Sequence, residues 1–373
     1  MPVTALTNRK TVEDYPGMPI YQKESDSGKE ELISQWSRIP TYRASTGLRG
    51  FVNMGATCFM SSILQTMVHN PFIRDYYMSG EHFDCDKELG ECIACCVGEI
   101  FSEFYTSNKT NGYGPTALLT AAWKVKRSLA GYSEQDAHEF WQFTLDELHK
   151  AHVAMNEDKI ELSKRQKKNS SPHAMLLDCS CVTHKTFAGE LQSSIMCTKC
   201  SSLTLTADPM LDLSLEISKK EDDNNNLISC LDKFTNIESL DMMYNCDTCG
   251  KRTPATKKLT IKRLSPVLAI QLKRFEHFSA TTSKIDTHVK FPLMLDVAKY
   301  TLDGSNITGD KTYELFAVVC HIGSVNTGHY ICYVKSREGK WFKFDDAVVT
   351  LVPSEEVLKV RAYLLYYIIH RLP

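Results

Sequence analysis

Cys58 stands where a polar loop becomes an apolar helix, within the segment GFVNMGATCFMSSILQTMVHNP. The unpaired N–H groups at a helix N-terminus carry partial positive charge, which lowers the pKa of a nearby thiol and favours the reactive thiolate. Gly55 allows a tight approach of the preceding loop, whose backbone amides could hold an oxyanion. The pattern indicates a nucleophile, with a small buried hydrophobic residue as the alternative interpretation of Cys58.

A cysteine nucleophile needs a base, normally a histidine that a carboxylate or amide orients. His329 follows a glycine-bounded loop and begins the strand-like segment GHYICYV, and Asp345 and Asp346 end the next such segment, KWFKFDD. Adjacent antiparallel strands with a short connection would place His329 beside Asp345. With Cys58 far upstream on a helix, this is the triad arrangement of papain-like enzymes. The alternative for His329 alone is a structural histidine.

Two CxxC pairs have the spacing of metal ligands. Cys197 and Cys200 form CTKC, and Cys246 and Cys249 form CDTC, both among polar residues. Two such pairs commonly present four thiolates to zinc in a tetrahedral site. The interval between them is longer than in a compact zinc ribbon. We therefore predict a structural zinc ion that joins the two pairs at the end of a long β-ribbon.

Two further groups of cysteine and histidine residues have similar spacing. One fits a zinc site with three cysteines and one histidine: His82, Cys85, Cys92 and Cys95. The other supplies three ligands, Cys179, Cys181 and His184, and its fourth ligand could be His149, His152, His173 or Cys230. Neither group leaves an open position near a general base, so these sites are predicted to be structural. Apolar surroundings favour the core for Cys230, Cys320 and Cys332. Cys96 is adjacent to Cys95 and would point away from the ligands, so it is also predicted to be a core residue.

Helices in the first half and strands in the second must position these residues. Apolar residues recur at helical spacing from Met60 to Val68, before Pro71, and again across SEQDAHEFWQFTLDELHKAH. After residue 185, six segments have strand composition: LSLEIS, VLAIQLKRF, ELFAVVCHIG, GHYICYVKS, KWFKF and AYLLYYII. Helices first and strands later, without βαβ alternation, predict an α+β protein whose helical part packs on an antiparallel sheet.

The bulk composition excludes several classes of protein. The 373 residues carry a net charge of −2, whereas a generic nucleic-acid binder is usually strongly basic. No secretory signal or membrane-spanning run is present, which predicts an intracellular protein with reduced thiols. Residues 1–45 are predicted to be a flexible lead-in. The basic run at 159–173 is predicted to be a solvated loop, with a charge-reading contact as the alternative.

Several motifs together resemble those of the ubiquitin-specific proteases. GFVNMGATCFMSSILQ is similar to the family's cysteine box, although Ala56 stands where the family often has asparagine. GHYICYV, WFKFDDAVV and AYLLYY resemble its histidine box, and YSEQDAHEF and LAIQLKRFEH resemble two further signatures. The similarity covers about residues 46–370, in the family's order. The zinc-ligand groups, LKRFEHF and EEVLKVRAYLLYY look most like the catalytic subunit of the deubiquitinating module of the SAGA coactivator.

The resemblance implies a papain-like catalytic domain at 46–373 with thumb, palm and zinc-stapled fingers. The thumb would span about 46–155, the fingers about 175–260, and the palm the remainder. The family pattern implies His149 as the fourth ligand of Cys179, Cys181 and His184, and three structural zinc ions in all. SAGA-type enzymes usually carry an N-terminal zinc-finger ubiquitin-binding domain. Residues 1–45 contain no cysteine or histidine, so we expect that domain to be absent.

The resemblance also implies a role for each site residue. Cys58 would attack the carbonyl of ubiquitin's terminal glycine, His329 would transfer the protons, and Asp345 would orient His329. The other matched positions are Asn53 as an oxyanion donor, Asp346 as an aid to the oxyanion or to a water, and Asp136 as a contact of ubiquitin's basic tail.

The implied activity is removal of ubiquitin from lysine side chains, with monoubiquitinated histone H2B in the nucleus as substrate. SAGA-type adaptor subunits are the implied partners, and we expect low activity without them. Neither membrane association nor sequence-specific nucleic-acid binding is expected. Three alternatives stay open: a catalytically silent ubiquitin-binding scaffold, a protease for another ubiquitin-like modifier, and a zinc-dependent chromatin reader.

Overall fold

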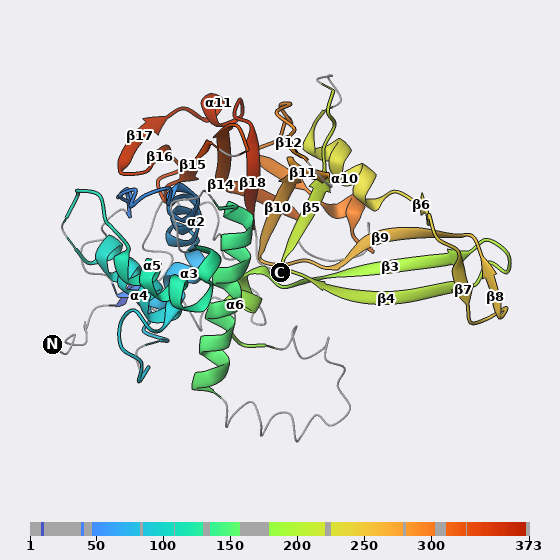
Figure 1. Cartoon of the computed structure of the whole chain (residues 1–373), viewed down its shortest axis with the longest axis horizontal. Coiled ribbons are helices and arrows are strands. Elements are labelled where there is room, and N and C mark those ends of the chain that lie inside the picture. Colours follow the sequence, from blue (N-terminus) through green and yellow to red (C-terminus); the bar gives the residue numbers. More distant parts are fainter. Residues whose placement is uncertain are drawn as a thin grey trace.

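The computed structural model describes residues 9–10, 39–40, 47–82, 85–107, 109–129, 135–156, 179–220, 225–278, 281–302, 311–325 and 327–370. Helices lie beside a large sheet, and a long β-ribbon projects away from both (Figure 1). Of the predicted lead-in, only β1 (Arg9–Lys10) and β2 (Ile39–Pro40) are described, as an antiparallel pair. The predictions for the rest of 1–45 and for the basic run at 159–173 fall outside the described residues.

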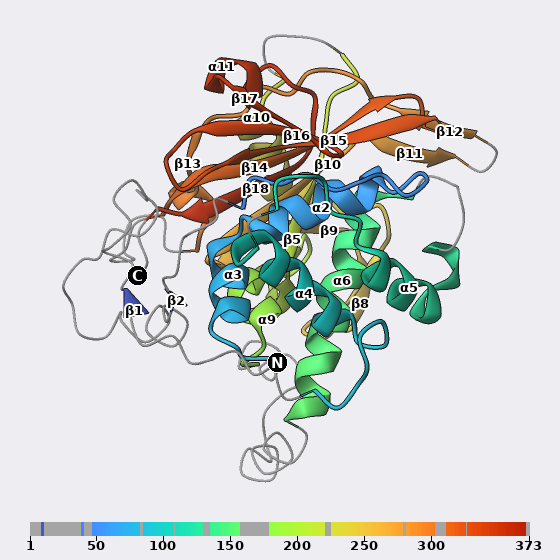
Figure 2. The same cartoon turned by 90° about the vertical axis from the view of Figure 1, so that its left-hand side faces the viewer.

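The helical part surrounds one central helix. It comprises α2 (Cys58–Val68), α3 (Pro71–Met78), α4 (Ile93–Tyr105), α5 (Thr116–Val125), η3 (Arg127–Leu129), α6 (Ala137–Met155) and α9 (Val182–Phe187). Every residue of α2 is buried, because the sheet covers one side of this helix and α3, α4 and α6 cover the others (Figure 2). The helix predicted before Pro71 ends at Val68, as expected, and Pro71 has a second role. It is the first residue of α3, where a proline loses no hydrogen bond, and Asn70 caps that helix.

The large sheet has the order β17-β16-β15-β14-β18-β10-β5, with β13 beside β14. Its strands are β5 (Asp212–Glu216), β10 (Val267–Lys273), β13 (Met294–Asp296), β14 (Thr312–Gly323), β15 (Gly328–Lys335), β16 (Trp341–Asp345), β17 (Val348–Val352) and β18 (Ala362–Ile369). The six predicted strands are all present, and the α+β class is confirmed. One prediction is wrong: β5 and β10 are parallel. The chain runs through the ribbon between them, and so long a connection permits a parallel return.

Both faces of this sheet are covered, so β18 is buried at all of its positions. Alternate residues of β18 enter two separate cores: Tyr366 packs with the helices, and Tyr367 packs with the opposite layer. That layer contains α10 (Leu227–Thr235) and η4 (Ala298–Tyr300), and α11 (Ser354–Val357) lies near the end of the chain. None of the described helices is long and apolar enough to cross a membrane.

The ribbon is a four-stranded antiparallel sheet of order β4-β3-β9-β6. Its strands are β3 (Gly189–Cys197), β4 (Leu203–Met210), β6 (Glu238–Ser239) and β9 (Ala255–Arg263), and the small pair β7 (Tyr244–Cys246) and β8 (Lys251–Thr253) lies at its far end (Figure 1). A further hairpin, β11 (Phe275–Phe278) with β12 (Thr281–Lys284), follows β10. The two CxxC pairs thus occupy the end of a long ribbon.

Candidate active site and metal centres

Cys58 is the first residue of α2 and is 3% exposed. The preceding turn is tight, because Gly55 and Ala56 both adopt left-handed backbone conformations with φ of 102° and 51°. For a residue with a Cβ this conformation costs about 1 kcal/mol, and asparagine tolerates it better than alanine. The first turn of α2 contains no acidic residue. No side-chain carboxylate of that turn therefore offsets the positive end of the helix dipole, which favours a thiolate at Cys58.

Asn53 is held by both ends of its side-chain amide. Its Oδ1 accepts hydrogen bonds from the backbone N–H of Gly55 at 3.0 Å and of Thr57 at 3.3 Å. Its Nδ2 donates to Oδ2 of Asp346 at 3.0 Å. Because the oxygen is committed to two backbone donors, the NH₂ group must face Asp346, and it has a second N–H to offer. The amide is thus oriented as a donor next to the turn that leads to Cys58.

Asp346 meets Asn53 because two backbone segments pack closely together. The N–H of Phe51 donates to the carbonyl of Asp346 at 3.0 Å. A Cβ at Gly50 would lie 2.5 Å from that carbonyl oxygen, so only glycine allows this approach. Asp346 itself has φ of 50°, and its Oδ1 is buried without a hydrogen-bond partner among the described residues. Asp346 therefore offers a buried acceptor oxygen beside the Asn53 amide.

His329 and Asp345 are hydrogen-bonded through Nε2 and Oδ1 at 2.8 Å. Burial acts to raise the pKa of Asp345, but the hydrogen bond and charge of His329, together with Lys343, outweigh it and lower the pKa overall. Since Nε2 is used by Asp345, Nδ1 is the nitrogen left to accept a proton. His329 lies near the start of β15, the strand against which α2 packs. The structure thus brings the histidine–aspartate pair and the cysteine-bearing helix to one region.

Asp136 is half-buried, whereas a residue that only contacts a ligand would be expected to be exposed. It is the N-cap of α6, and its Oδ1 accepts from the N–H groups of His138 at 2.7 Å and Glu139 at 3.1 Å. Its Oδ2 accepts from the hydroxyl of Tyr363 at 2.7 Å. One oxygen thus caps α6 and the other binds β18, so the carboxylate links the start of α6 to the sheet. The predicted contact with ubiquitin would use the remaining lone pairs of this carboxylate.

This carboxylate belongs to a ring of polar contacts that sequence reasoning missed, in which the single hydroxyl hydrogen of Ser214 is shared between Asp212 and Gln271. The ring comprises Asp136, Tyr363, Gln271, Ser214, Asp212 and His138, with links between 2.7 and 3.1 Å. It joins α6 to three strands of the large sheet, β18, β10 and β5. One signal was present in the sequence: Gln271 is a polar residue in the otherwise apolar run VLAIQL. A polar side chain in a strand with buried neighbours needs partners, but the sequence did not indicate which.

The three predicted groups of metal ligands are each brought together. In every group the four ligand atoms lie within 4.8 Å of one another: His82, Cys85, Cys92 and Cys95; His149, Cys179, Cys181 and His184; Cys197, Cys200, Cys246 and Cys249. Of the four alternatives for the second group, His149 is the residue in place. His152 contacts Ser180, and Cys230 is a residue of α10 that is buried in the core. His173 lies outside the described residues.

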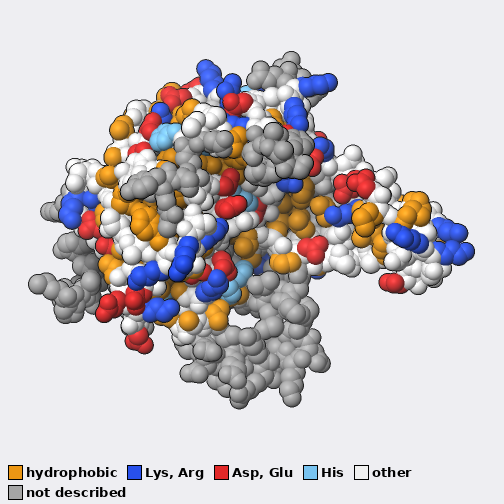
Figure 3. All heavy atoms as spheres, in the orientation of Figure 1, with side chains coloured by type: hydrophobic (Ala, Val, Ile, Leu, Met, Phe, Trp, Pro, Cys, Tyr) orange, Lys and Arg blue, Asp and Glu red, His pale blue; other side chains and the backbone are white. Residues whose placement is uncertain are grey.

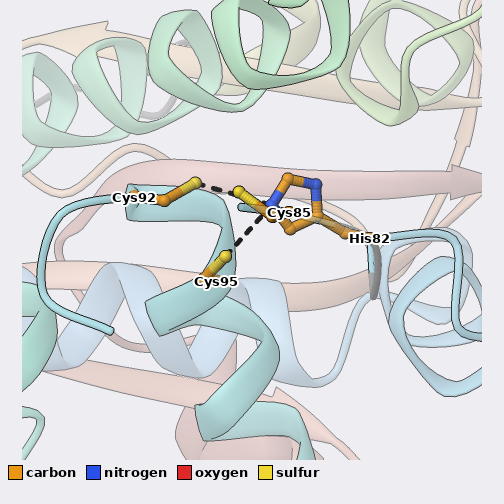
Figure 4. A group of neighbouring side chains, drawn as sticks. All are labelled: His82, Cys85, Cys92 and Cys95. Atoms are coloured by element: carbon orange, nitrogen blue, oxygen red, sulfur yellow. Dashed lines mark hydrogen bonds between the residues drawn. The ribbon is translucent and has the colours of Figure 1, made fainter. Parts of the chain in front are cut away.

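The ligand spacing fits zinc. Zn–S bonds of about 2.3 Å and Zn–N bonds of about 2.1 Å give tetrahedral ligand–ligand distances of roughly 3.3–3.8 Å. In the first group, His82 Nε2 lies 3.5 Å from Cys92 Sγ and 3.3 Å from Cys95 Sγ (Figure 4). In the second, His149 Nδ1 lies 3.7 Å from Cys179 Sγ, which joins α6 to the segment before α9.

The third group lies at the end of the ribbon, where Sγ of Cys200 and Cys246 are 3.6 Å apart. The Ser202 hydroxyl and the backbone N–H of Cys249 lower the pKa of Cys246 to about 6. A thiol that ionises readily is a better metal ligand. The described cysteines predicted to be core residues, Cys96, Cys230, Cys320 and Cys332, are all buried and belong to none of these groups.

A family model described as ubiquitin carboxyl-terminal hydrolase matches residues 49–367. The chain belongs to this family. Ubiquitin carboxyl-terminal hydrolase 8 of Saccharomyces cerevisiae is 40% identical over 356 residues, which cover 89% of this chain and 73% of that protein. Ubiquitin carboxyl-terminal hydrolase 22 of Homo sapiens is 34% identical over 363 residues, covering 88% of this chain and 67% of that protein.

Solved structures agree with the sequence comparison. The chain matches a structure of the SAGA DUB module of Ubp8, Sgf11, Sus1 and Sgf73 bound to monoubiquitin, with a TM-score of 0.76 and 38% identity. The match covers 92% of this chain and 74% of that chain. The predicted resemblance to the SAGA-type ubiquitin-specific proteases is confirmed, and so is the architecture of their catalytic domain. As a member of this family, the protein is a cysteine-type deubiquitinase.

If Asn53 has the oxyanion role that the resemblance implies, its replacement by alanine lowers kcat by about 10²–10³-fold with little change in KM, because such a donor acts chiefly in the transition state. Steady-state hydrolysis of a fluorogenic ubiquitin amide measures both constants. Asn70→Ala is the control: the Asn70 side chain likewise accepts hydrogen bonds from two backbone N–H groups, but they belong to α3, which it caps. A rise in KM with unchanged kcat would instead assign Asn53 to substrate binding.

Proposed function

We propose that the protein hydrolyses the isopeptide bond between the C-terminus of ubiquitin and a substrate lysine, with Cys58 as nucleophile and His329 as base. The observation that carries the assignment is the 2.8 Å hydrogen bond between His329 and Asp345 on the strands beside α2, whose first residue is Cys58. A silent scaffold would not need this pair to be preserved. The geometry is therefore better explained by catalysis than by binding alone.

The reaction follows from the donors and acceptors in place. His329 takes the proton of the Cys58 thiol, and the resulting thiolate attacks the carbonyl carbon of the terminal glycine. Asn53 donates to the oxygen that becomes negative. His329 gives its proton to the departing lysine amine, which leaves a thioester on Cys58. His329 then removes a proton from water, which hydrolyses the thioester and releases the ubiquitin carboxylate. Asp345 keeps Nε2 of the imidazole engaged throughout, so that Nδ1 exchanges the proton.

The ribbon offers a surface for a protein substrate. Met196, Leu203 and Leu205 lie on one face of the β3–β4 ladder, and the two leucines are more than half exposed. Figure 3 shows hydrophobic side chains along this projection and lysine and arginine side chains toward its tip. Exposed apolar residues on a rigid ribbon mark an interaction surface. We assign this surface to the binding of ubiquitin. In this proposal the fingers span about 175–260, the thumb spans about 46–155, and the palm is the remainder.

The similarity to SAGA enzymes supports finer proposals. Because the matched structure contains Sgf11, Sus1 and Sgf73, we propose adaptor proteins of this kind as partners. Monoubiquitinated histone H2B is the proposed substrate, and the nucleus the proposed location. We also propose Asp136 as a contact of ubiquitin's basic tail, and three structural zinc ions in the three ligand groups. Each of these properties of SAGA-type enzymes can be tested on this chain.

Ubiquitin bearing a C-terminal electrophile tests the function directly. We expect one covalent adduct that maps to Cys58 by mass spectrometry and that is absent in Cys58→Ala. If the isolated chain does not react, the adaptor subunits are added. Labelling only with adaptors would mean activation by assembly, and no labelling in either condition would favour the silent scaffold. The same probe built on another ubiquitin-like modifier should not react, and preferential labelling by it would reassign the substrate.

A further inference from the structure

Lys284, the last residue of β12, reaches out of its own hairpin to another strand. Its side chain is 7% exposed. Nζ donates to the backbone carbonyls of His321 at 3.0 Å and Gly323 at 2.8 Å, and it lies 3.0 Å from Oδ1 of Asp286. An ammonium group has three N–H donors, and each has an acceptor here. Two of the three acceptors belong to the end of β14.

That end of β14 is paired with the residue proposed as the base. Ile322 is the register partner of His329, and Gly323 is the partner of Gly328. The two carbonyls that Lys284 binds therefore lie on either side of the residue opposite His329. Because β15 takes its position from this ladder, the ammonium group holds the backbone on which His329 is mounted.

A second contact from the same hairpin acts on the same place. The buried ring of His321 packs edge-on against Phe275 of β11, with the ring centroids 5.2 Å apart. A Cβ at Gly328 would overlap that imidazole ring, so the ring lies directly against the residue before His329. The hairpin thus contacts the side chain of His321 through Phe275 and the backbone carbonyl of His321 through Lys284.

The base of the hairpin is anchored to the large sheet. Arg274 is buried, and its Nε donates to the carbonyl of Ala362 in β18 at 2.6 Å. Its Nη1 donates to the carbonyls of Ile285 at 2.9 Å and Thr287 at 2.8 Å, on the segment that follows Lys284. Lys284 therefore acts from a fixed support, which is what a positioning group requires.

We propose that Lys284 is a positioning residue for His329. It holds the end of β14 so that the imidazole keeps its orientation between Asp345 and Cys58. The proposal rests on the proposed function, because it assigns Lys284 to the same triad. Without the ammonium group, the carbonyls of His321 and Gly323 lose this donor and the strand end is free to shift. A displacement of about 1 Å in an active site can lower the rate by about 10²-fold.

The test is Lys284→Met, which keeps an unbranched side chain of nearly the same length and removes the donors. The readout is the rate at which iodoacetamide alkylates Cys58, followed on the Cys58 peptide because the chain has 14 cysteines. We expect this rate to fall by about tenfold or more, toward that of His329→Ala, because the thiolate depends on an aligned histidine. For a fluorogenic ubiquitin amide, kcat should fall while KM is unchanged.

Lys219→Met is the matched control. Lys219 is 62% exposed and pairs with Glu276 of β11 at 2.8 Å, so its loss affects the same hairpin without affecting β14. We expect wild-type alkylation for this variant. If Lys284→Met does not fold, as judged by its thermal melt, Lys284→Gln replaces it, and the same decrease is expected.

The outcomes separate this inference from the proposed function. A folded Lys284 variant that alkylates like wild type, while His329→Ala is slow, would overturn the role of Lys284 alone. An equal loss in Lys219→Met would also overturn it. If His329→Ala itself alkylates as fast as wild type, the proposed triad fails and the inference fails with it.

Discussion

His329→Ala is expected to lower kcat/KM for a fluorogenic ubiquitin amide by about 10⁴-fold or more, as the loss of a catalytic histidine does in related mechanisms. Two functions are lost together: the proton acceptor for Cys58 and the donor for the departing amine. Ubiquitin binding should be retained, because the residue contributes to the reaction step. Steady-state kinetics and a binding titration with free ubiquitin, both with the adaptor subunits present, separate these effects.

His288→Ala is the control for this experiment. His288 is also partly buried, but it contacts the carbonyl of Leu358, outside the candidate site. Its replacement should leave kcat/KM close to wild type. More than about one hundredth of the activity remaining in His329→Ala would be too much for a triad base. In that case a different residue would have to be the proton acceptor.

Cys95→Ser is expected to remove one zinc ion per chain and to lower the melting temperature strongly. Structural zinc supplies about 10–16 kcal/mol of apparent binding free energy in small zinc domains, and this contributes to folding. Cys95 and its three partners hold His82 and Cys85 on the start of α4. Metal analysis by mass spectrometry should find three zinc ions in the wild type and two in the variant, and calorimetry should show the lower melting temperature.

The neighbouring cysteine provides a matched control. Cys96 is buried beside Cys95 but belongs to none of the ligand groups among the described residues. Cys96→Ser should therefore keep three zinc ions and lose only the smaller free energy of a core substitution. A chelator should destabilise all three regions at once. An unchanged melt after verified zinc removal would mean that these groups hold together without metal.

Local patterns in the sequence were enough to predict α2, α6, six strands of the large sheet and most of the metal-ligand groups. The helical spacing after Cys58 and the apolar composition of the late segments predicted α2 and six strands of the large sheet, since a helix or strand face repeats over a few residues. The CxxC pairs predicted a metal centre for a similar reason: ligands on one knuckle are close in the sequence. The family motifs added the expected role of each residue.

Contacts between distant segments could not be predicted in this way. Asn53 and Asp346 are hydrogen-bonded although 293 positions separate them. Four candidates fitted the fourth ligand of the second zinc group, and the packing of α6 beside α9 selected His149. The parallel pairing of β5 with β10 follows from the path of the chain through the ribbon. In each case the partner is chosen by packing, which sequence spacing does not encode.

The sequence by itself determined the chemistry available to this protein: a thiol at a helix start, a histidine and carboxylates near strand ends, and three sets of soft metal ligands. These depend on residue type and short-range periodicity, which are local properties. Only the tertiary structure decided how these groups are held. The ring through Asp136 and the contacts of Lys284 join strands and helices from separate parts of the chain. Such contacts exist only once the sheet and the helices have packed, because their geometry is set by the whole core.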